Sequence, residues 1–363
     1  MALHAQDAPL QTIEEDISAF AFAPDGRIVY SVRHPFSTKF RIGARAETYD
    51  LQRDDIWIQE AAGKRRRLIQ GEKLVHGAAP FSYSVDSFRF SPDGRMILAE
   101  LNARFVVDKD GTTRDAEMAL LFDETGKQVR IADQKELLFD ASSGGWLADN
   151  ATIVYLTEAV KPHLLYGITS LRFASGRAIS LFAGRTFVDA AWLPKSSSAV
   201  VIERDRNLTG PPRLQRLDLV KETDAELATL DGYSGGLSVS PSGTRAAYFL
   251  DHEVLEIRDL ASPSHVARVR VGFGPYQWAP DEKRILLKRA VAKKTGDLVW
   301  IDLPPLSDEA AARKTTIPVA EPALTPLFHG LGFRDFGISP DGRFLAVIQP
   351  GKRNLLFYPL NVH

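Results

Sequence analysis

Cysteine is absent from the 363 residues of the sequence. This absence excludes disulfide bonds, thiol nucleophiles and thiolate metal sites. The sequence also lacks any apolar run near the ~18 residues that a helix needs to cross a bilayer. We therefore expect a soluble protein with no membrane span.

An excess of charge of either sign is absent too. The 45 basic residues balance 46 acidic ones, and the formal net charge is −1. A balanced surface has no general attraction for nucleic acids or acidic membranes, so we expect neither as a partner. The apolar fraction of 44% provides enough buried surface for one large globular body or two ordinary domains.

What the sequence does contain is a repeat. Phe88–Leu98 has the pattern of a strand, a tight turn and a second strand, and close copies occur at Phe20–Tyr30 and Gly337–Val347. In each copy Pro-Asp-Gly-Arg lies between two alternating apolar runs. Proline presets φ, aspartate bonds the local backbone and glycine takes a positive φ, so each copy predicts a β-hairpin.

Weaker copies extend this repeat along the whole chain. The turn prolines or their equivalents are Pro24, Pro92, Ala148, Pro194, Pro241, Pro280 and Pro340. Several copies are followed by a second hairpin, such as Asp55–Ile58 with Gly63–Ile69. A period of roughly 40 to 45 residues, lengthened by insertions, is typical of four-stranded blades. The sequence predicts an all-β, seven-bladed β-propeller of antiparallel blades that forms a single domain over residues 1–363.

The last repeat indicates how the ring closes. After Pro340 the sequence supplies two strands, Phe344–Ile348 and Asn354–Tyr358. The run Pro9–Ile13 alternates ahead of the first copy and has no blade of its own. We therefore expect this N-terminal strand to pair beside Leu355–Tyr358 and close the propeller, which removes exposed sheet edges.

The first residues bear on location. Ala2–Pro9 resembles the small-residue cleavage region of a signal peptide, which predicts an exported or periplasmic protein. The alternative is an ordinary flexible tail on a cytoplasmic protein.

The segment Gly232–Gly236 matches the nucleophile elbow of serine hydrolases, with Ser234 at its centre. An elbow needs a helix after the serine, whereas Leu237–Val239 continues as a strand into the next turn. We interpret the segment as a glycine-rich connection between blades and predict no catalytic residue.

A second motif matches part of an EF-hand calcium loop. Asp108, Asp110 and Glu117 occupy its third, fifth and twelfth positions, but Val106 occupies the first. Flanking strands favour a hairpin tip at 109–112 instead. The three acids are candidate metal ligands, and calcium is the one metal considered; no other cofactor is predicted.

Three aspartates have a shared position in the repeats. Asp86, Asp189 and Asp335 each precede an expected innermost strand by a few residues. The starts of these strands gather at one mouth of a propeller channel, where carboxylates suit a cation or a basic peptide end. The alternative is that they only accept hydrogen bonds at the strand starts.

Two insertions interrupt the repeats. The first, 37–53, follows His34 and contains Lys39 and Arg41, so we expect either a contact surface for an anionic partner or a solvated mobile loop. The second lies between Leu303 and Pro326. There Ser307 is placed to cap a short helix over 308–314.

Phe-Ser-Pro-Asp-Gly-Arg at 90–95, with Asp55–Trp57 and Gly63–Leu68, resembles the propeller repeat of TolB-type proteins and of the N-terminal domain of prolyl oligopeptidases. The resemblance covers nearly the whole chain. It implies a propeller that acts as a protein-docking platform or as a gate over a peptidase. The sequence holds no hydrolase domain, so no catalytic residue is carried over.

These observations predict a non-enzymatic, monomeric binding or scaffold propeller, which docks a protein, peptide or glycan at the channel mouth or on the inserted loops. The alternative is a propeller enzyme of the lactonase or lyase type, with a metal or acid/base groups in the axial channel.

Overall fold

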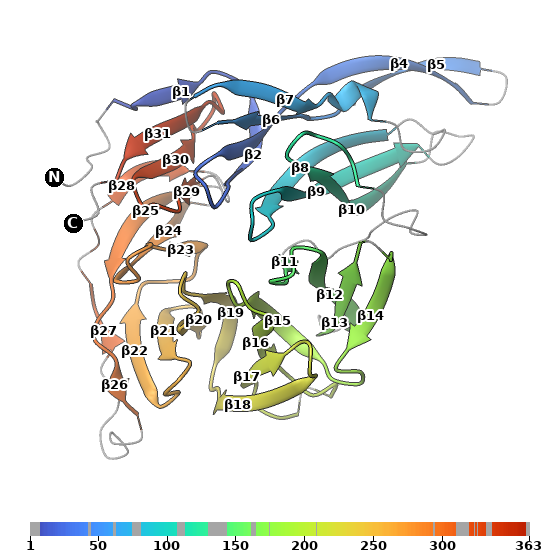
Figure 1. The fold of residues 1–363 in the computed structure, drawn as a ribbon. Coiled ribbons are helices and arrows are strands. Elements are labelled where there is room, and N and C mark those ends of the chain that lie inside the picture. Colours follow the sequence, from blue (N-terminus) through green and yellow to red (C-terminus); the bar gives the residue numbers. More distant parts are fainter. Residues whose placement is uncertain are drawn as a thin grey trace.

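The computed structural model describes residues 8–42, 45–60, 63–74, 81–106, 113–129, 144–160, 165–173, 175–207, 209–292, 295–309, 319–322, 324, 326–331 and 336–360. Within these residues the chain is almost entirely β, and the one helical element is the 3-10 turn η1 (Gly71–Lys73). No helix in this part of the chain is long and apolar enough to cross a membrane. Figure 1 shows the sheets arranged in a ring.

The strands of the first half of the chain form four antiparallel groups, and each group comes from one repeat of the sequence. In order they are β2 (Ile17–Phe22), β3 (Ile28–Val32), β6 (Asp55–Gln59) and β7 (Arg65–Ile69); β8 (Phe81–Phe90), β9 (Met96–Val106) and β10 (Thr113–Asp123); β11 (Gly145–Trp146), β12 (Thr152–Val160), β13 (Leu165–Arg172) and β14 (Arg177–Leu181); β15 (Phe187–Trp192), β16 (Ser198–Glu203), β17 (Arg213–Asp218) and β18 (Thr223–Thr229). A single paired position, Tyr166 with Phe187, joins the third group to the fourth.

The second half continues in the same way. Its groups are β19 (Tyr233–Val239), β20 (Arg245–Leu250), β21 (Val254–Asp259) and β22 (His265–Arg270); β23 (Tyr276–Trp278), β24 (Arg284–Ala292), β25 (Thr295–Asp302) and β28 (Pro326–Leu331); β29 (Phe336–Ile338), β30 (Phe344–Ile348), β31 (Leu355–Pro359) and β1 (Gln11–Ile13). Strand β1 lies antiparallel beside β31, with Gln11 opposite Phe357 and Ile13 opposite Leu355. The last group therefore combines strands from both ends of the described chain.

The repeated turn is stabilised by bonds within six residues. The Ser91 hydroxyl donates to Asp93 at 2.6 Å and accepts the Met96 N–H at 2.9 Å. Gly94 closes the turn at φ +73°, in the left-handed region that favours glycine. The copy at Ser339 makes the same bonds to Asp341 and to the Phe344 N–H. The Ser-Pro-Asp-Gly motif thus specifies the hairpin that the sequence predicts.

The hydrophobic core lies between neighbouring groups of strands. Tyr83, Phe88 and Ile97 of the second group pack on Val29 and Ile56 of the first. A comparable cluster joins the last group to the first, where Ile17 and Tyr30 contact Ala346, Ile348 and Phe357. Because each group buries both faces, middle strands contain apolar residues at successive positions, as in Ala346, Val347 and Ile348 of β30.

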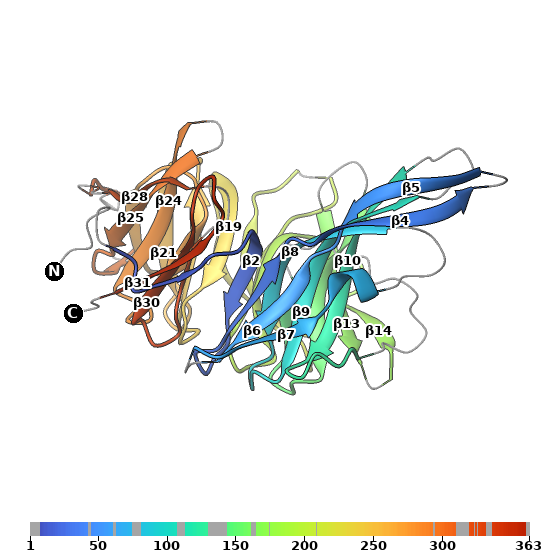
Figure 2. The same ribbon diagram turned by 90° about the horizontal axis from the view of Figure 1, so that it is seen from above.

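Both insertions differ from the expectations. Residues 37–53 do not form a loop, because β4 (Pro35–Ile42) and β5 (Arg45–Gln52) pair as a hairpin that extends away from the ring (Figure 2). Ser307 does not cap a helix, since β26 (Ser307–Asp308) pairs with β22, as does β27 (Val319–Ala320) in parallel. Most of the expected helix, 310–314, lies outside the described residues. Backbone pairing with an exposed sheet edge explains the strand at 307–308.

Candidate binding site

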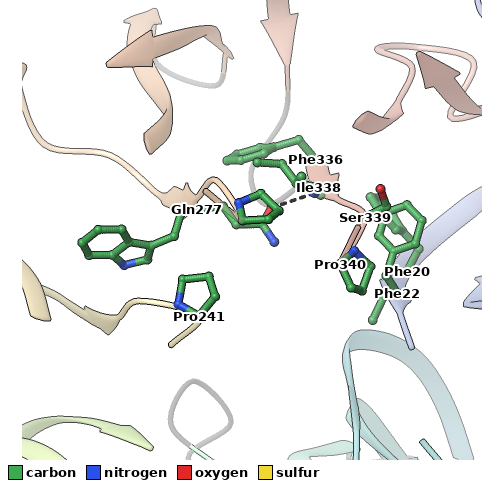
Figure 3. Close-up of a pocket in the computed structure, with 12 residues that line it drawn as sticks. Phe20, Phe22, Pro241, Gln277, Phe336, Ile338, Ser339 and Pro340 are labelled. Carbon is green, nitrogen blue, oxygen red and sulfur yellow. Dashed lines mark hydrogen bonds between the residues drawn. The ribbon is translucent and has the colours of Figure 1, made fainter. Parts of the chain in front are cut away.

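A pocket of about 410 Å³ lies where the inner strands of the first, fifth, sixth and last groups converge. Its lining residues are Phe20, Ala21, Phe22, Pro241, Gln277, Trp278, Pro280, Phe336, Gly337, Ile338, Ser339 and Pro340. Figure 3 shows Phe20 and Phe22 on one side and Pro241 on the other. The twelve residues include no ionisable side chain, so the lining provides aromatic and aliphatic contact surface.

Strand alternation places the aromatic rings of β2 in this pocket. Phe20 and Phe22 lie two residues apart, and their ring centroids are 6.2 Å apart in an edge-to-face arrangement. Gly337 of β29 lies directly against this pair, because a Cβ added there would be 3.0 Å from the Phe20 ring. Glycine at 337 therefore allows the last group to approach the first closely at the pocket.

Gln277 is the main polar side chain of the lining. Its Oε1 accepts the backbone N–H of Ile338 at 2.9 Å, which ties β23 to β29 (Figure 3). No hydrogen bond joins its amide nitrogen to another described residue. The pocket thus has two amide N–H groups that can donate to a ligand carbonyl.

Beside the pocket, a chain of hydrogen bonds runs along the inner strands. The Trp278 indole donates to the Ser238 hydroxyl at 2.9 Å, and that hydroxyl donates to Tyr276 at 2.8 Å. The Tyr276 hydroxyl lies 2.6 Å from the Gly236 carbonyl and 2.7 Å from that of Ala247. These bonds hold Trp278 in place as one wall of the pocket.

Asp189 joins the fourth group to the fifth. Its Oδ2 accepts the Tyr233 hydroxyl at 2.6 Å and the Leu237 N–H at 3.1 Å, and its Oδ1 accepts the Ala190 N–H at 2.8 Å. Burial raises the pKa of Asp189, and these bonds offset only part of the shift. Burial and the Asp189 charge also raise the pKa of Tyr233, so its hydroxyl stays protonated and donates.

Asp54 makes the equivalent connection between the first two groups. The Asp54 carboxylate accepts the Val85 N–H of β8 at 2.9 Å, and burial raises its pKa. Together with Asp189 and Gln277, it shows one recurring device in which a polar side chain accepts an N–H from the inner strand of the next group. This device satisfies backbone groups where bulges interrupt strand pairing.

Two of the three predicted aspartates can be placed, and both lie within a strand rather than ahead of it. Asp86 lies within β8 and Asp189 within β15, because both strands begin earlier than the pattern indicated. Each falls at a register shift, between Val85 and Ser87 and after Phe187. Asp86 is exposed, and Asp335 lies outside the described residues. A common carboxylate site stays a prediction, and the pocket lies toward the other ends of the inner strands.

The other predicted residues are dispersed. The His34 ring contacts Glu72 at 3.4 Å and lies 4.0 Å from Asp55 at the base of the β4–β5 hairpin. Arg41 belongs to β4, near the far end of that hairpin. The structure therefore separates these two candidates along one element.

The candidate metal ligands are only partly covered. Asp108 and Asp110 lie outside the described residues, and Glu117 belongs to β10, opposite Asn102 of β9. Among the residues that are described, no three His, Asp or Glu side chains come together in a way that could hold a metal ion.

Ser234 does not lead into a helix. It is the second residue of β19, and its hydroxyl accepts the His252 N–H at 2.9 Å. Gly235 and Gly236 both have positive φ, at a register shift of the same strand. The glycines thus form a bulge on an inner strand, where the elbow pattern arises without elbow geometry.

Comparison with known proteins establishes the fold. No protein-family model matches the sequence, and no curated protein sequence matches it. A chain in the crystal structure of a mitotic checkpoint complex aligns at TM-score 0.56 and 12% identity, over 97% of this chain and 92% of that one. The Dos1 propeller aligns at TM-score 0.51 and 11% identity, over 97% of this chain and 94% of that one. The chain has a β-propeller fold. TolB from Acinetobacter baumannii aligns at TM-score 0.44 and 13% identity, over 81% of this chain and 83% of that one.

The pocket residues of this propeller were missed by sequence reasoning, although the repeat contains their signal. Phe20, Phe22, Trp278 and Phe336 lie two or four residues before an anchor proline. In the first, sixth and last groups the side chains at these positions line the pocket, whereas Phe88, four residues before Pro92, packs between the first two groups. Aligning aromatic residues by anchor therefore yields candidates for the lining but does not identify which strands converge.

Proposed function

We propose that the chain is a single seven-bladed β-propeller, closed by β1 on the outer side of β31. Seven hydrophobic clusters support this count. Each lies between two neighbouring groups of strands, and the seventh joins the last group to the first. A closed ring also accounts for the pairing of Ile13 with Leu355, which completes a four-stranded blade from both chain ends.

The propeller acts, in this proposal, as a binding module for an uncharged, proline-rich or apolar peptide segment of a partner protein. The observation that carries the proposal is the central pocket, whose lining consists of aromatic rings, prolines and one amide. Its volume falls within the range of about 300–1,000 Å³ of ligand pockets. Aromatic-lined grooves bind extended proline-rich segments, and the Gln277 amide is placed to donate to a peptide carbonyl.

Location and assembly state remain part of the proposal. The small residues of Ala2–Pro9 support an exported or periplasmic protein. A monomer accords with ring closure, which leaves each blade covered by its neighbours.

The pocket is tested by titrating the full chain with a fluorescein-labelled peptide of sequence Pro-Pro-Leu-Pro-Pro and following its anisotropy. Phe22→Asp introduces a charge into the lining and is expected to weaken binding at least about tenfold, because a carboxylate would lose its hydration there. Phe273→Asp is the matched control, since Phe273 is 45% exposed and does not line the pocket.

Two results would argue against the pocket as the binding site. One is equal affinity of the wild type and Phe22→Asp when both melt at similar temperatures. The other is tight binding of a peptide in which all prolines are replaced by glutamate.

A further inference from the structure

The β4–β5 hairpin is a two-stranded sheet with open edges. Eight residue pairs join it, from Pro35 opposite Gln52 to Ile42 opposite Arg45. Among the described residues neither strand pairs with a third strand. Both views show the hairpin extending beyond the ring (Figures 1 and 2). Such a hairpin is marginally stable alone and gains stability from an additional strand.

The base of the hairpin shows which backbone groups point outward. The Gln52 N–H donates to the Ser82 hydroxyl of β8 at 3.0 Å, and that hydroxyl donates to the Gln52 carbonyl at 2.7 Å. Gln52 therefore does not bond across the hairpin to Pro35, which has no N–H. The Arg53 N–H does donate to the His34 carbonyl, at 3.0 Å, so bonded and non-bonded pairs alternate from this end.

The alternation of bonded and non-bonded pairs then shows which backbone groups point outward along the rest of the hairpin. On β4 the outward N–H and C=O groups belong to Ser37, Lys39 and Arg41, which lie opposite Asp50, Thr48 and Ala46. On β5 the corresponding outward groups belong to those three partners. The Ser82 contact occupies the outer side of β5 at its base, whereas no strand among the described residues pairs with the outer edge of β4.

The two edges differ in charge. Strand β4 contains Lys39 and Arg41 and no acidic residue, whereas β5 contains Glu47 and Asp50 with Arg45 near the turn. Lys39 is exposed, and its outward backbone groups lie on the same edge as those of Arg41. The outer edge of β4 is therefore a row of backbone donors and acceptors with the exposed, basic side chain of Lys39 next to it.

We propose that the outer edge of β4 binds an extended acidic peptide segment of a partner protein as a third strand. In strand addition, main-chain hydrogen bonds provide affinity and the alternate side chains provide selectivity. With acidic residues at every second position of the peptide, one of them lies beside Lys39 as a cross-strand neighbour of opposite charge. This surface is independent of the central pocket and does not depend on its proposed ligand.

A second copy of this chain fits the edge less well. Antiparallel pairing of two β4 edges brings the Lys39 and Arg41 positions of both copies together, which like charges disfavour. Basic residues on an exposed edge also prevent edge-to-edge aggregation. Partner binding predicts that a variant that removes a backbone N–H without changing charge loses affinity for the peptide. A purely protective role predicts no such loss.

The experiment uses the full chain and a fluorescein-labelled peptide Glu-Val-Glu-Thr-Glu-Val-Glu, followed by anisotropy. Ser37→Pro removes one outward N–H of β4 without a change in charge, and proline is tolerated at a strand edge. Thr48→Pro removes the equivalent N–H from β5, and Ser37→Ala controls for the lost hydroxyl bond to Asp50. We expect Ser37→Pro to weaken binding about tenfold and the two controls to bind as the wild type does.

A charge exchange provides the second measurement. Lys39→Glu is expected to weaken binding of the acidic peptide by at least about fivefold and to favour the peptide with lysine in place of glutamate. Replacing residues 37–50 by a Gly-Ser linker removes the edge and abolishes binding, while the melting temperature stays within about 2 °C because the hairpin lies outside the ring.

Several results would overturn the proposal. They are no binding of the acidic peptide by the wild type, equal binding of the lysine peptide, or loss of binding in Thr48→Pro but not in Ser37→Pro. A concentration-dependent dimer in sedimentation that Ser37→Pro abolishes would identify a second copy as the occupant instead.

Discussion

Asp189 illustrates what a single buried carboxylate does in this propeller. Its two oxygens receive three hydrogen bonds, from Tyr233, Leu237 and Ala190, and two of these come from the next blade. The same role falls to Asp54 between the first two blades. At the residue scale, Asp189 and Asp54 therefore act as connectors between inner strands.

Replacing Asp189 by asparagine is expected to flatten the pH dependence of stability. A pKa raised in the folded state means that the folded protein binds the proton more tightly than the unfolded chain. The stability from this group is present below its unfolded pKa of about 3.9 and is lost as pH rises through the folded pKa. Urea unfolding at pH 4 and pH 7 should show a smaller loss in Asp189→Asn than in the wild type.

Asp218 provides the control with the opposite sign. Hydrogen bonds from the Lys221 and Val220 N–H groups lower its pKa, so its contribution is present above about pH 3.9 and is lost on acidification. Asp218→Asn should therefore reduce stability at pH 7 more than at low pH. Identical pH profiles for the two variants would contradict the role assigned to Asp189.

At the scale of elements, one network joins three strands of the fifth blade, β20, β21 and β22, to the insertion of the sixth. Glu256 of β21 is 1% exposed and accepts bonds from Tyr248, Arg258 and Arg268, the last at 2.8 Å. Arg268 continues to Glu309, which follows β26, at 2.9 Å. The insertion is thus attached to the outer edge of β22 by charge as well as by backbone pairing.

Glu256→Gln is expected to cost about 3 kcal/mol of unfolding free energy, because it leaves two arginines without a buried counter-charge. Burial disfavours the Glu256 carboxylate, but Arg258, Tyr248 and Arg268 outweigh that effect and lower its pKa. The contribution is therefore lost as pH falls. Chemical denaturation at pH 7 measures the cost.

Glu253→Gln is the comparison for that substitution. Glu253 contacts Arg270 at 2.5 Å but is 63% exposed, and exposed pairs contribute about 0–1 kcal/mol. Equal losses of unfolding free energy in Glu256→Gln and Glu253→Gln would show that the buried network stabilises the protein no more than an exposed ion pair does.

At the scale of the whole molecule, the proposed closure by β1 predicts a dependence of stability on the N-terminal strand. Residues 11–13 contribute only one short strand, yet Ile13 is 1% exposed and packs with Ile348 and Leu355 between the first and last blades. Removing residues 1–15 is expected to lower the melting temperature by at least about 5 °C, since it exposes the edge of β31 and a core cluster. Circular dichroism follows the transition.

Ile13→Asp tests the packing of Ile13 without shortening the chain. It keeps the strand but buries a charge in the same cluster, so it should destabilise the ring in the same direction. Deletion of residues 1–8 alone leaves β1 in place and should have little effect. An unchanged melt after removal of 1–15 would contradict closure by β1.

The repeat, its turns and hence the fold class follow from local chemistry that can be read along the chain. The Ser-Pro-Asp-Gly turn is specified by bonds within six residues, as at Ser91 and Met96, so local chemistry suffices. The sequence does not distinguish a loop from a hairpin at 37–53, although Phe36, Thr38 and Tyr49 fit the alternation of paired strands, because an insertion has no repeat to align it with.

Only the tertiary structure decided where the candidate site lies. Phe22, Trp278 and Phe336 belong to different repeats, and no local pattern shows that their strands converge on one pocket. The hydrogen-bond partners of Asp189 likewise depend on contacts between blades, since its carboxylate accepts the N–H of Leu237, which lies 48 residues away in the sequence. Strand sequences specify which faces are buried, whereas the ring specifies which distant side chains and edges meet a ligand.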